Sequence, residues 1–174
     1  MIQKGQMKMQ KHYTCCFTGH RPNKLPFGYD EQDERCIKIK NQLKSQIVAL
    51  ITQKDVTHFI TGMALGIDLI CAEIVIELKE KYPFITLESA IPYEEQAANW
   101  TDEQRDRYYR IAELCDKETL LQYHYNKWCF QNRNRYMVDK SDFIIAVWNG
   151  ERSGTANTVK YAESQNKEII IIEP

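Results

Sequence analysis

Two glycine-containing turns carry residue types that could bind a phosphate group. The first, at residues 61–68, reads Thr-Gly-Met-Ala-Leu-Gly-Ile-Asp and leads from a short apolar segment into an amphipathic one. The second, at residues 149–155, follows another apolar segment and ends in Ser-Gly-Thr. A turn from a strand into a helix presents unpaired backbone N–H groups at the positive end of the helix dipole, where an anion is stabilised. Together, the two turns predict a nucleotide-like ligand.

Side chains near these turns would complete such a site. Arg21 follows the first apolar segment, where its guanidinium could clamp a phosphate, and the neighbouring His20 could act as an acid or a base. Asp68 would repel a phosphate, so it is better suited to accept a hydrogen bond from a ribose hydroxyl. On a helix, Arg133 and Arg135 do not share a face, so at most one can point at a given ligand. The predicted ligand-binding residues are Gly19, His20, Arg21, Gly62, Met63, Ala64, Gly66, Asp68, Arg133, Asn149, Gly150, Ser153, Gly154 and Thr155.

Structural roles would explain several of these residues equally well. Gly62 and Gly66 would form a tight turn with close helix packing. Ser153 would be an ordinary helix N-cap, and Asp68 would balance the charge at a helix start. Arg21 would be a surface arginine in a loop. Both interpretations stay open from the sequence alone.

No motif in the chain identifies a reaction or a metal. The Gly-x-x-x-Gly spacing of the first turn matches neither the dinucleotide fingerprint nor a Walker loop. We find no nucleophile elbow, no histidine–glutamate metal helix and no convincing triad. The acidic candidates near the expected ligand edge show no pairing typical of an acid–base couple; they are Asp68, Glu94, Glu95 and Glu151. We therefore predict no metal and no certain cofactor, and leave catalytic residues unassigned.

Composition limits the classes of partner. The chain has 174 residues and a formal net charge of -1, so it offers no global basic field for nucleic acid or an anionic membrane. No stretch is long enough to span a bilayer. The six cysteines lack metal-site spacing and residues 1–11 lack an apolar signal sequence, so we expect a cytoplasmic protein. We predict a flexible segment at residues 1–12 and a single domain at residues 13–174.

Apolar periodicity predicts strands that alternate with helices. Strands are expected at residues 13–18, 58–61, 84–91, 118–122, 142–148 and 168–172. Helices are expected at residues 31–54, 66–82, 94–115, 130–140 and 155–165, with Asp30 as the N-cap of the first. The later strands are continuous apolar runs, which are typical of a parallel sheet covered on both faces. The predicted fold class is α/β, a three-layer Rossmann-like domain with a mostly parallel sheet.

Longer segments form an ordered set of motifs: Gly-His-Arg-Pro at 19–22, the turn at 61–68, Ile-Pro-Tyr at 91–93 with Gln96 and Trp100, Asn-Arg-Tyr-Met-Val-Asp at 134–139, and Ala-Val-Trp-Asn-Gly at 146–150. Together they resemble the YpsA-like branch of the SLOG superfamily, which groups the Lonely Guy phosphoribohydrolases with the DNA-processing protein A (Smf) proteins. The resemblance covers the chain from about residue 13. It implies a Rossmann-like sensor or regulator that binds a nucleotide derivative related to NAD or ADP-ribose, self-associates, and has no assigned reaction.

The two related groups set the alternatives. Lonely Guy enzymes cleave a base from a nucleoside monophosphate, which implies a nucleotide N-glycosidase. Arg133 falls at their arginine position, but Thr158 stands where they have a glutamate, so a carboxylate such as Glu94 or Glu95 would have to replace it. DNA-processing protein A relatives bind single-stranded DNA, and residues 133–135 and 153–154 echo their pattern. DNA binding ranks last, because no basic stripe interleaved with aromatic residues is evident in the sequence.

Overall fold

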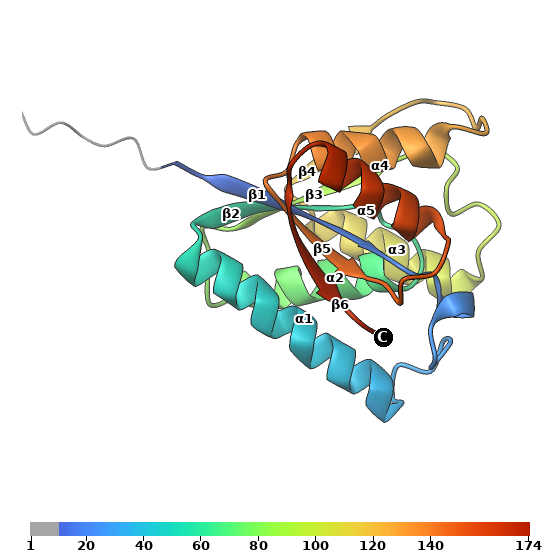
Figure 1. Cartoon of the computed structure of the whole chain (residues 1–174). Coiled ribbons are helices and arrows are strands. Elements are labelled where there is room, and N and C mark those ends of the chain that lie inside the picture. The colour runs from blue at the N-terminus through green and yellow to red at the C-terminus, as the bar shows by residue number, and fades with distance from the viewer. Residues whose placement is uncertain (1–10) are drawn as a thin grey trace, which may run out of the picture.

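The computed structural model describes residues 11–174 (Figure 1). Nearly all of the segment predicted to be flexible, residues 1–12, lies outside the described residues. The strands are β1 (Tyr13–Gly19), β2 (Val56–Thr61), β3 (Thr86–Ile91), β4 (Lys117–Leu120), β5 (Phe143–Val147) and β6 (Glu168–Ile172). The α-helices are α1 (Glu34–Gln53), α2 (Ile67–Leu78), α3 (Asp102–Leu114), α4 (Cys129–Asp139) and α5 (Gly154–Ser164). A short 3-10 helix, η1 (Pro22–Lys24), follows β1.

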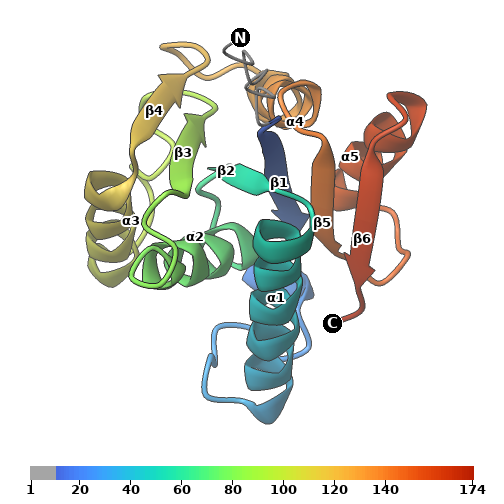
Figure 2. The ribbon, with the colours of Figure 1, turned by 90° about the vertical axis from the view of Figure 1, so that its left-hand side faces the viewer.

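The strands form one sheet in the order β4-β3-β2-β1-β5-β6, as Figure 2 shows. Every pair of neighbouring strands is parallel. From β1 to β4 the sheet grows in one direction, and the chain then crosses to β5 on the other side of β1. In open α/β sheets such a reversal of strand order opens a crevice at the carboxyl ends of the strands. The predicted three-layer Rossmann-like fold is confirmed, and its site is expected between β1 and β5.

Helices cover both faces of the sheet. In Figure 1, α4 and α5 lie on one face, and α1, α2 and α3 lie on the other. The larger core forms against α1 and α2 and includes Leu43, Ile47 and Phe59, which are fully buried. A smaller cluster with Ile60 and Met137 lies under α4 and α5. Strand β5, Phe-Ile-Ile-Ala-Val, is buried along its whole length because it is covered on both faces.

Helix α1 begins later than its acidic residues predict. Asp30 was the expected N-cap, but α1 begins at Glu34 and its N-cap is Asp33. The Oδ1 atom of Asp33 accepts the backbone N–H of Arg35, whereas Asp30 accepts the N–H of Gln32 in the preceding turn. Aspartates close together compete for local backbone donors, and here the first one stabilises a turn instead of the helix.

The helix predicted at residues 94–115 is also shorter. Thr101 and Gln104 form a capping box, in which each side chain accepts the other residue's backbone N–H, and this box starts α3. The residues before it form turns. Gln96 in these turns is buried, and its Nε2 donates to the carbonyl of Met63 at 2.8 Å. The segment therefore supports the loop that follows β2.

Candidate functional site

A cavity of about 300 Å³ lies at the reversal of strand order, between the carboxyl end of β1 and the start of α5. Helix α4 and the loop after β2 complete its wall. The predicted residues that line it are Gly19, His20, Arg21, Ala64, Asp68, Arg133, Ser153, Gly154 and Thr155. The predicted residues outside its lining are Gly62, Met63, Gly66, Asn149 and Gly150. We call this space the β1–α5 cavity.

His20 presents a buried nitrogen that lacks a partner. Its side chain is 2% exposed, and its Nε2 lies 2.8 Å from Oδ1 of Asn149. That oxygen also accepts the N–H of Glu151 at 3.1 Å, so Nε2 must be the donor of the pair. Nδ1 then has no hydrogen-bond partner among the described residues. Asn149 thus orients the ring without lining the cavity. Nδ1 is an exception to the rule that buried nitrogens are hydrogen-bonded.

Arg133 and Asp68 form a buried pair of opposite charges in the cavity wall. Nη1 of Arg133 donates to the carbonyl of Gly62, and its Nε donates to Oδ1 of Asn134 at 2.8 Å. Oδ2 of Asp68 accepts the N–H of Ala64 at 3.3 Å. Burial raises the pKa of Asp68 and lowers the pKa of Arg133, and the attraction between them opposes both shifts. The hydrogen bond from Arg133 to Gly62 joins α4 to the loop after β2.

The glycines of the first turn make room for this packing. A Cβ atom at Gly62 would lie 2.5 Å from Nη1 of Arg133 and 2.7 Å from Oδ2 of Asp68. Gly66 has φ +94, and a Cβ there would lie 2.8 Å from the carbonyl oxygen of His20. Both positions therefore require glycine for close approach, and Gly66 also for its backbone conformation. Contact of these glycines with a ligand stays a prediction.

At the start of α5, the Ser153 N-cap leaves backbone N–H groups without helical partners, and anion binding there stays a prediction. Oγ of Ser153 accepts the N–H of Ala156 at 3.1 Å, and the first helical bond runs from Asn157 N–H to the Ser153 carbonyl. The N–H groups of Gly154 and Thr155 come before these bonds and have no partner within the helix. A Cβ atom at Gly154 would meet nothing within 4 Å. Gly154, at the positive end of α5, therefore lines the cavity with open space beside its Cα.

Cationic side chains surround this helix start. Arg21 is exposed at the mouth of the cavity, with its Cζ 5.1 Å from the centre of the Phe130 ring. Lys24 also lines the cavity, and its Nζ donates to the carbonyl of Arg152 at 3.4 Å. Sequence reasoning missed Lys24 and Phe130. The position of Phe130, three residues before Arg133 on the same helix, is the one signal that could have found it.

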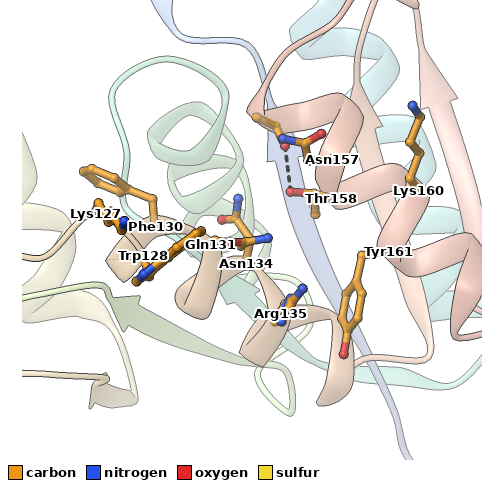
Figure 3. A pocket seen from close by; sticks show the side chains of 11 residues that line it. Lys127, Trp128, Phe130, Gln131, Asn134, Arg135, Asn157, Thr158, Lys160 and Tyr161 are labelled. Atoms are coloured by element: carbon orange, nitrogen blue, oxygen red, sulfur yellow. Dashed lines mark hydrogen bonds between the residues drawn. The ribbon is translucent and has the colours of Figure 1, made fainter.

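A second space, of about 580 Å³, lies between α4 and α5 (Figure 3). We call it the α4–α5 groove. Phe130, Asn134 and Gly154 line both the groove and the β1–α5 cavity, so the two spaces adjoin. The groove lining contains basic and aromatic side chains and no aspartate or glutamate; it comprises Lys127, Trp128, Phe130, Gln131, Asn134, Arg135, Gly154, Asn157, Thr158, Lys160 and Tyr161. Sequence reasoning did not find this basic and aromatic surface.

Within the described residues, no helix is long and apolar enough to cross a membrane. The same part of the chain holds no cluster of three or more histidine, cysteine, aspartate or glutamate side chains placed to bind a metal ion.

Comparison with known sequences assigns the chain to a family. A family model named YpsA, described as the YspA SLOG family, matches residues 15–174. The chain belongs to this family. One relative, the uncharacterized SPbeta prophage-derived protein YoqJ of Bacillus subtilis, is 36% identical over 139 residues; the match covers 73% of this chain and 81% of YoqJ.

Solved structures share the fold of this SLOG family member. DNA processing protein A from Streptococcus pneumoniae matches with a TM-score of 0.61 at 14% identity, over 92% of this chain and 50% of that one. The single-stranded-DNA-binding DNA processing protein A from Helicobacter pylori matches with a TM-score of 0.59 at 16% identity, over 91% of this chain and 64% of that one. The chain thus spans about half to two thirds of these proteins.

The two arginines of α4 in this SLOG family member differ in their exposure to solvent. Arg133 is buried in the cavity wall, whereas Arg135 on the same helix is exposed and lines the groove, as their helical spacing predicts. Thr158, at the position of the Lonely Guy glutamate, donates its hydroxyl to the carbonyl of Gly154 at 3.0 Å. Among the described residues that line the β1–α5 cavity, Asp68 is the only carboxylate.

Proposed function

We propose that the β1–α5 cavity binds the phosphate and ribose of a nucleotide derivative, and that the protein acts as a sensor or regulator. The observation that supports this most strongly is the position of the cavity at the reversal of strand order, with the start of α5 open to it. Arg21 and Lys24 add positive charge at the same place. A phosphate is the ligand group that this combination favours.

The buried side chains assign the remaining contacts. Asp68 accepts a hydrogen bond from a ribose hydroxyl, because the negative charge of the carboxylate disfavours a phosphate. Nδ1 of His20 meets a polar group of the ligand, which removes the cost of leaving that nitrogen unpaired. Arg133 is held by Gly62 and Asn134, so it contributes charge from a fixed position. A site of about 300 Å³ is at the small end for ligand pockets, which suits a single phosphate–ribose unit.

Calorimetric titration with AMP tests this proposal. We expect Gly154→Val to fill the open space at the start of α5 and to weaken AMP binding at least tenfold, while the far-ultraviolet spectrum stays native. Arg21→Ala should weaken binding as well. Arg35→Ala is the matched control, because Arg35 is an exposed arginine at the start of α1, outside the cavity lining. Unchanged AMP affinity in Gly154→Val and Arg21→Ala would contradict the proposal.

A second candidate function, cleavage of a nucleotide N-glycosidic bond, is favoured by the position of Asp68. Its carboxyl lies in the cavity, and burial raises its pKa, as in many catalytic acids. We expect release of the free base from AMP if this function is present, with loss of release but retained AMP binding in Asp68→Asn. Absence of base release by the native protein across AMP, GMP, CMP and UMP would count against hydrolysis and leave binding as the function.

A further inference from the structure

We propose that the α4–α5 groove is a second subsite that binds a nucleobase, so that the ligand contains two nucleoside units joined through phosphate. This rests on the proposed function of the adjoining β1–α5 cavity. Gly154 and Phe130 line both spaces, so a phosphate held at the start of α5 lies at the entrance to the groove. A ligand bound there can continue into the groove without crossing a barrier of protein.

The volumes indicate a ligand larger than one nucleotide. The cavity holds about 300 Å³ and the groove about 580 Å³. Sites for cofactors and other small molecules commonly span several hundred Å³ up to about 1,000 Å³. The cavity alone suits a phosphate and a ribose, and the larger groove has room for a base with a second sugar.

The aromatic side chains of the groove suit a base. Trp128 is 54% exposed, although tryptophan is usually well covered, and Lys127 lies 4.9 Å from the centre of its ring. On the opposite wall, the ring centre of Tyr161 on α5 lies 5.2 Å from Cζ of Arg135 on α4. Flat aromatic and guanidinium surfaces stack on bases of any sequence. Figure 3 shows Trp128 on one side of the groove and Tyr161 on the other, with Arg135 between them.

The polar side chains of the groove suit the rest of a nucleotide. Lys127, Arg135 and Lys160 provide positive charge, and the groove lining contains no acidic side chain. Asp139, which accepts the hydroxyl of Tyr161 at 2.8 Å, fixes that ring from outside the lining. The side-chain amides of Gln131 and Asn157 have no hydrogen bonds to other described residues, so they remain for the edge of a base.

Calorimetric titration with one-unit and two-unit ligands tests the subsite. AMP is the one-unit probe, NAD is the free two-unit probe, and single-stranded hexathymidylate presents the same units in a strand. We expect NAD or hexathymidylate to bind at least tenfold more tightly than AMP. Trp128→Ala should weaken the two-unit ligand by about five- to 150-fold, the range for loss of one stacked base, and leave AMP affinity within twofold. Lys160→Ala should weaken binding of the two-unit ligand by a smaller factor than Trp128→Ala.

Matched controls separate the groove from general effects. Tyr109→Ala removes an exposed aromatic side chain on α3, and Lys38→Ala removes an exposed lysine on α1; both should leave every affinity unchanged. The tighter of the two long probes identifies the source of the second unit. If AMP binds but Trp128→Ala and Lys160→Ala leave both long probes unaffected, the subsite is wrong and the proposed function stands. If no probe binds the native protein, both are overturned.

Discussion

At the scale of single residues, the cavity wall contains two buried, oppositely charged side chains whose proximity the sequence did not reveal. Arg133 and Asp68 are 4% and 7% exposed, and each occupies a place where its charge alone would be costly. Their sequence separation gives no local signal. The pair explains the glycine at position 62, because any side chain there would collide with both charged groups. The glycine turn at residues 61–68 therefore has a packing role that does not depend on a ligand.

Replacing Arg133 should lower the free energy of unfolding, because the buried carboxylate of Asp68 would lose its nearby positive charge. In Arg133→Met, Asp68 loses the charge that opposes its raised pKa, so the carboxyl becomes harder to ionise in the folded state. A folded-state pKa above the unfolded value lowers stability as pH rises. We expect a loss of about 3–5 kcal/mol at pH 7 and a smaller loss at pH 4.5, measured by urea unfolding. Adding Asp68→Asn to Arg133→Met should restore part of the lost stability. Equal losses at pH 7 and pH 4.5 would contradict this role for the Asp68 charge.

Two glycines of the predicted turns, Gly66 and Gly154, should differ in how much stability the same substitution costs. Gly66→Ala places a Cβ against the carbonyl of His20 in a left-handed conformation, so we expect a loss of stability of about 2 kcal/mol or more. Gly154→Ala adds the same atom in open space at the start of α5, so its unfolding free energy should stay within about 0.5 kcal/mol of the native value. A loss of less than about 0.5 kcal/mol in Gly66→Ala would show that the loop after β2 tolerates a side chain.

At the scale of elements, one buried carboxylate joins three strands and a helix. Glu88 on β3 is 2% exposed. Its Oε2 lies 2.9 Å from Nε2 of His58 on β2, and its Oε1 accepts hydrogen bonds from Tyr136 on α4 and Thr119 on β4. Lys117 on β4 donates as well. Although burial opposes ionisation, these donors hold the pKa of Glu88 at about 2. The network secures the β3–β4 edge, where α4 meets the sheet.

The contribution of Glu88 should depend on pH. Its folded-state pKa is lowered, so its stabilisation is present above the ordinary value of 4.5 and is lost as pH falls from there towards about 2. We expect Glu88→Gln to cost about 2–3 kcal/mol at pH 7. Unfolding measured between pH 7 and pH 2.5 should show the native protein and the variant converging at low pH. A constant difference over that range would rule out this role for the carboxylate.

Strand and helix order could be predicted from the sequence, because each element carries its own pattern of apolar residues. The continuous run from Phe143 to Val147 indicated a strand covered on both faces, and it is buried throughout. Local signals failed where two acidic caps competed, at Asp30 and Asp33. They also gave no sign of Glu88, a single acid in an apolar strand whose partners come from three other elements.

At the scale of the whole molecule, topology gathers parts of the site that are distant in sequence. The reversal of strand order between β1 and β5 brings Arg21 close to the start of α5, more than a hundred residues later in the chain. The sequence could predict that these turns meet at one edge of the sheet, but not that Lys24 and Phe130 line the cavity there. The α4–α5 groove is a stronger case, because Trp128 and Lys160 line one space only after both helices pack on the same face. A net charge of -1 thus conceals a locally basic surface.

Thermal unfolding with and without AMP and NAD tests the central claim, that the β1–α5 cavity binds a nucleotide, most directly. A ligand that binds only the folded protein raises the midpoint in proportion to the logarithm of its concentration. At a hundredfold excess over the dissociation constant the gain is about 2.7 kcal/mol, or roughly 5–10 °C for a protein of this size. We predict such a shift in the native protein and its loss in Gly154→Val. No shift with either nucleotide at millimolar concentration, or an equal shift in Gly154→Val, would contradict the claim.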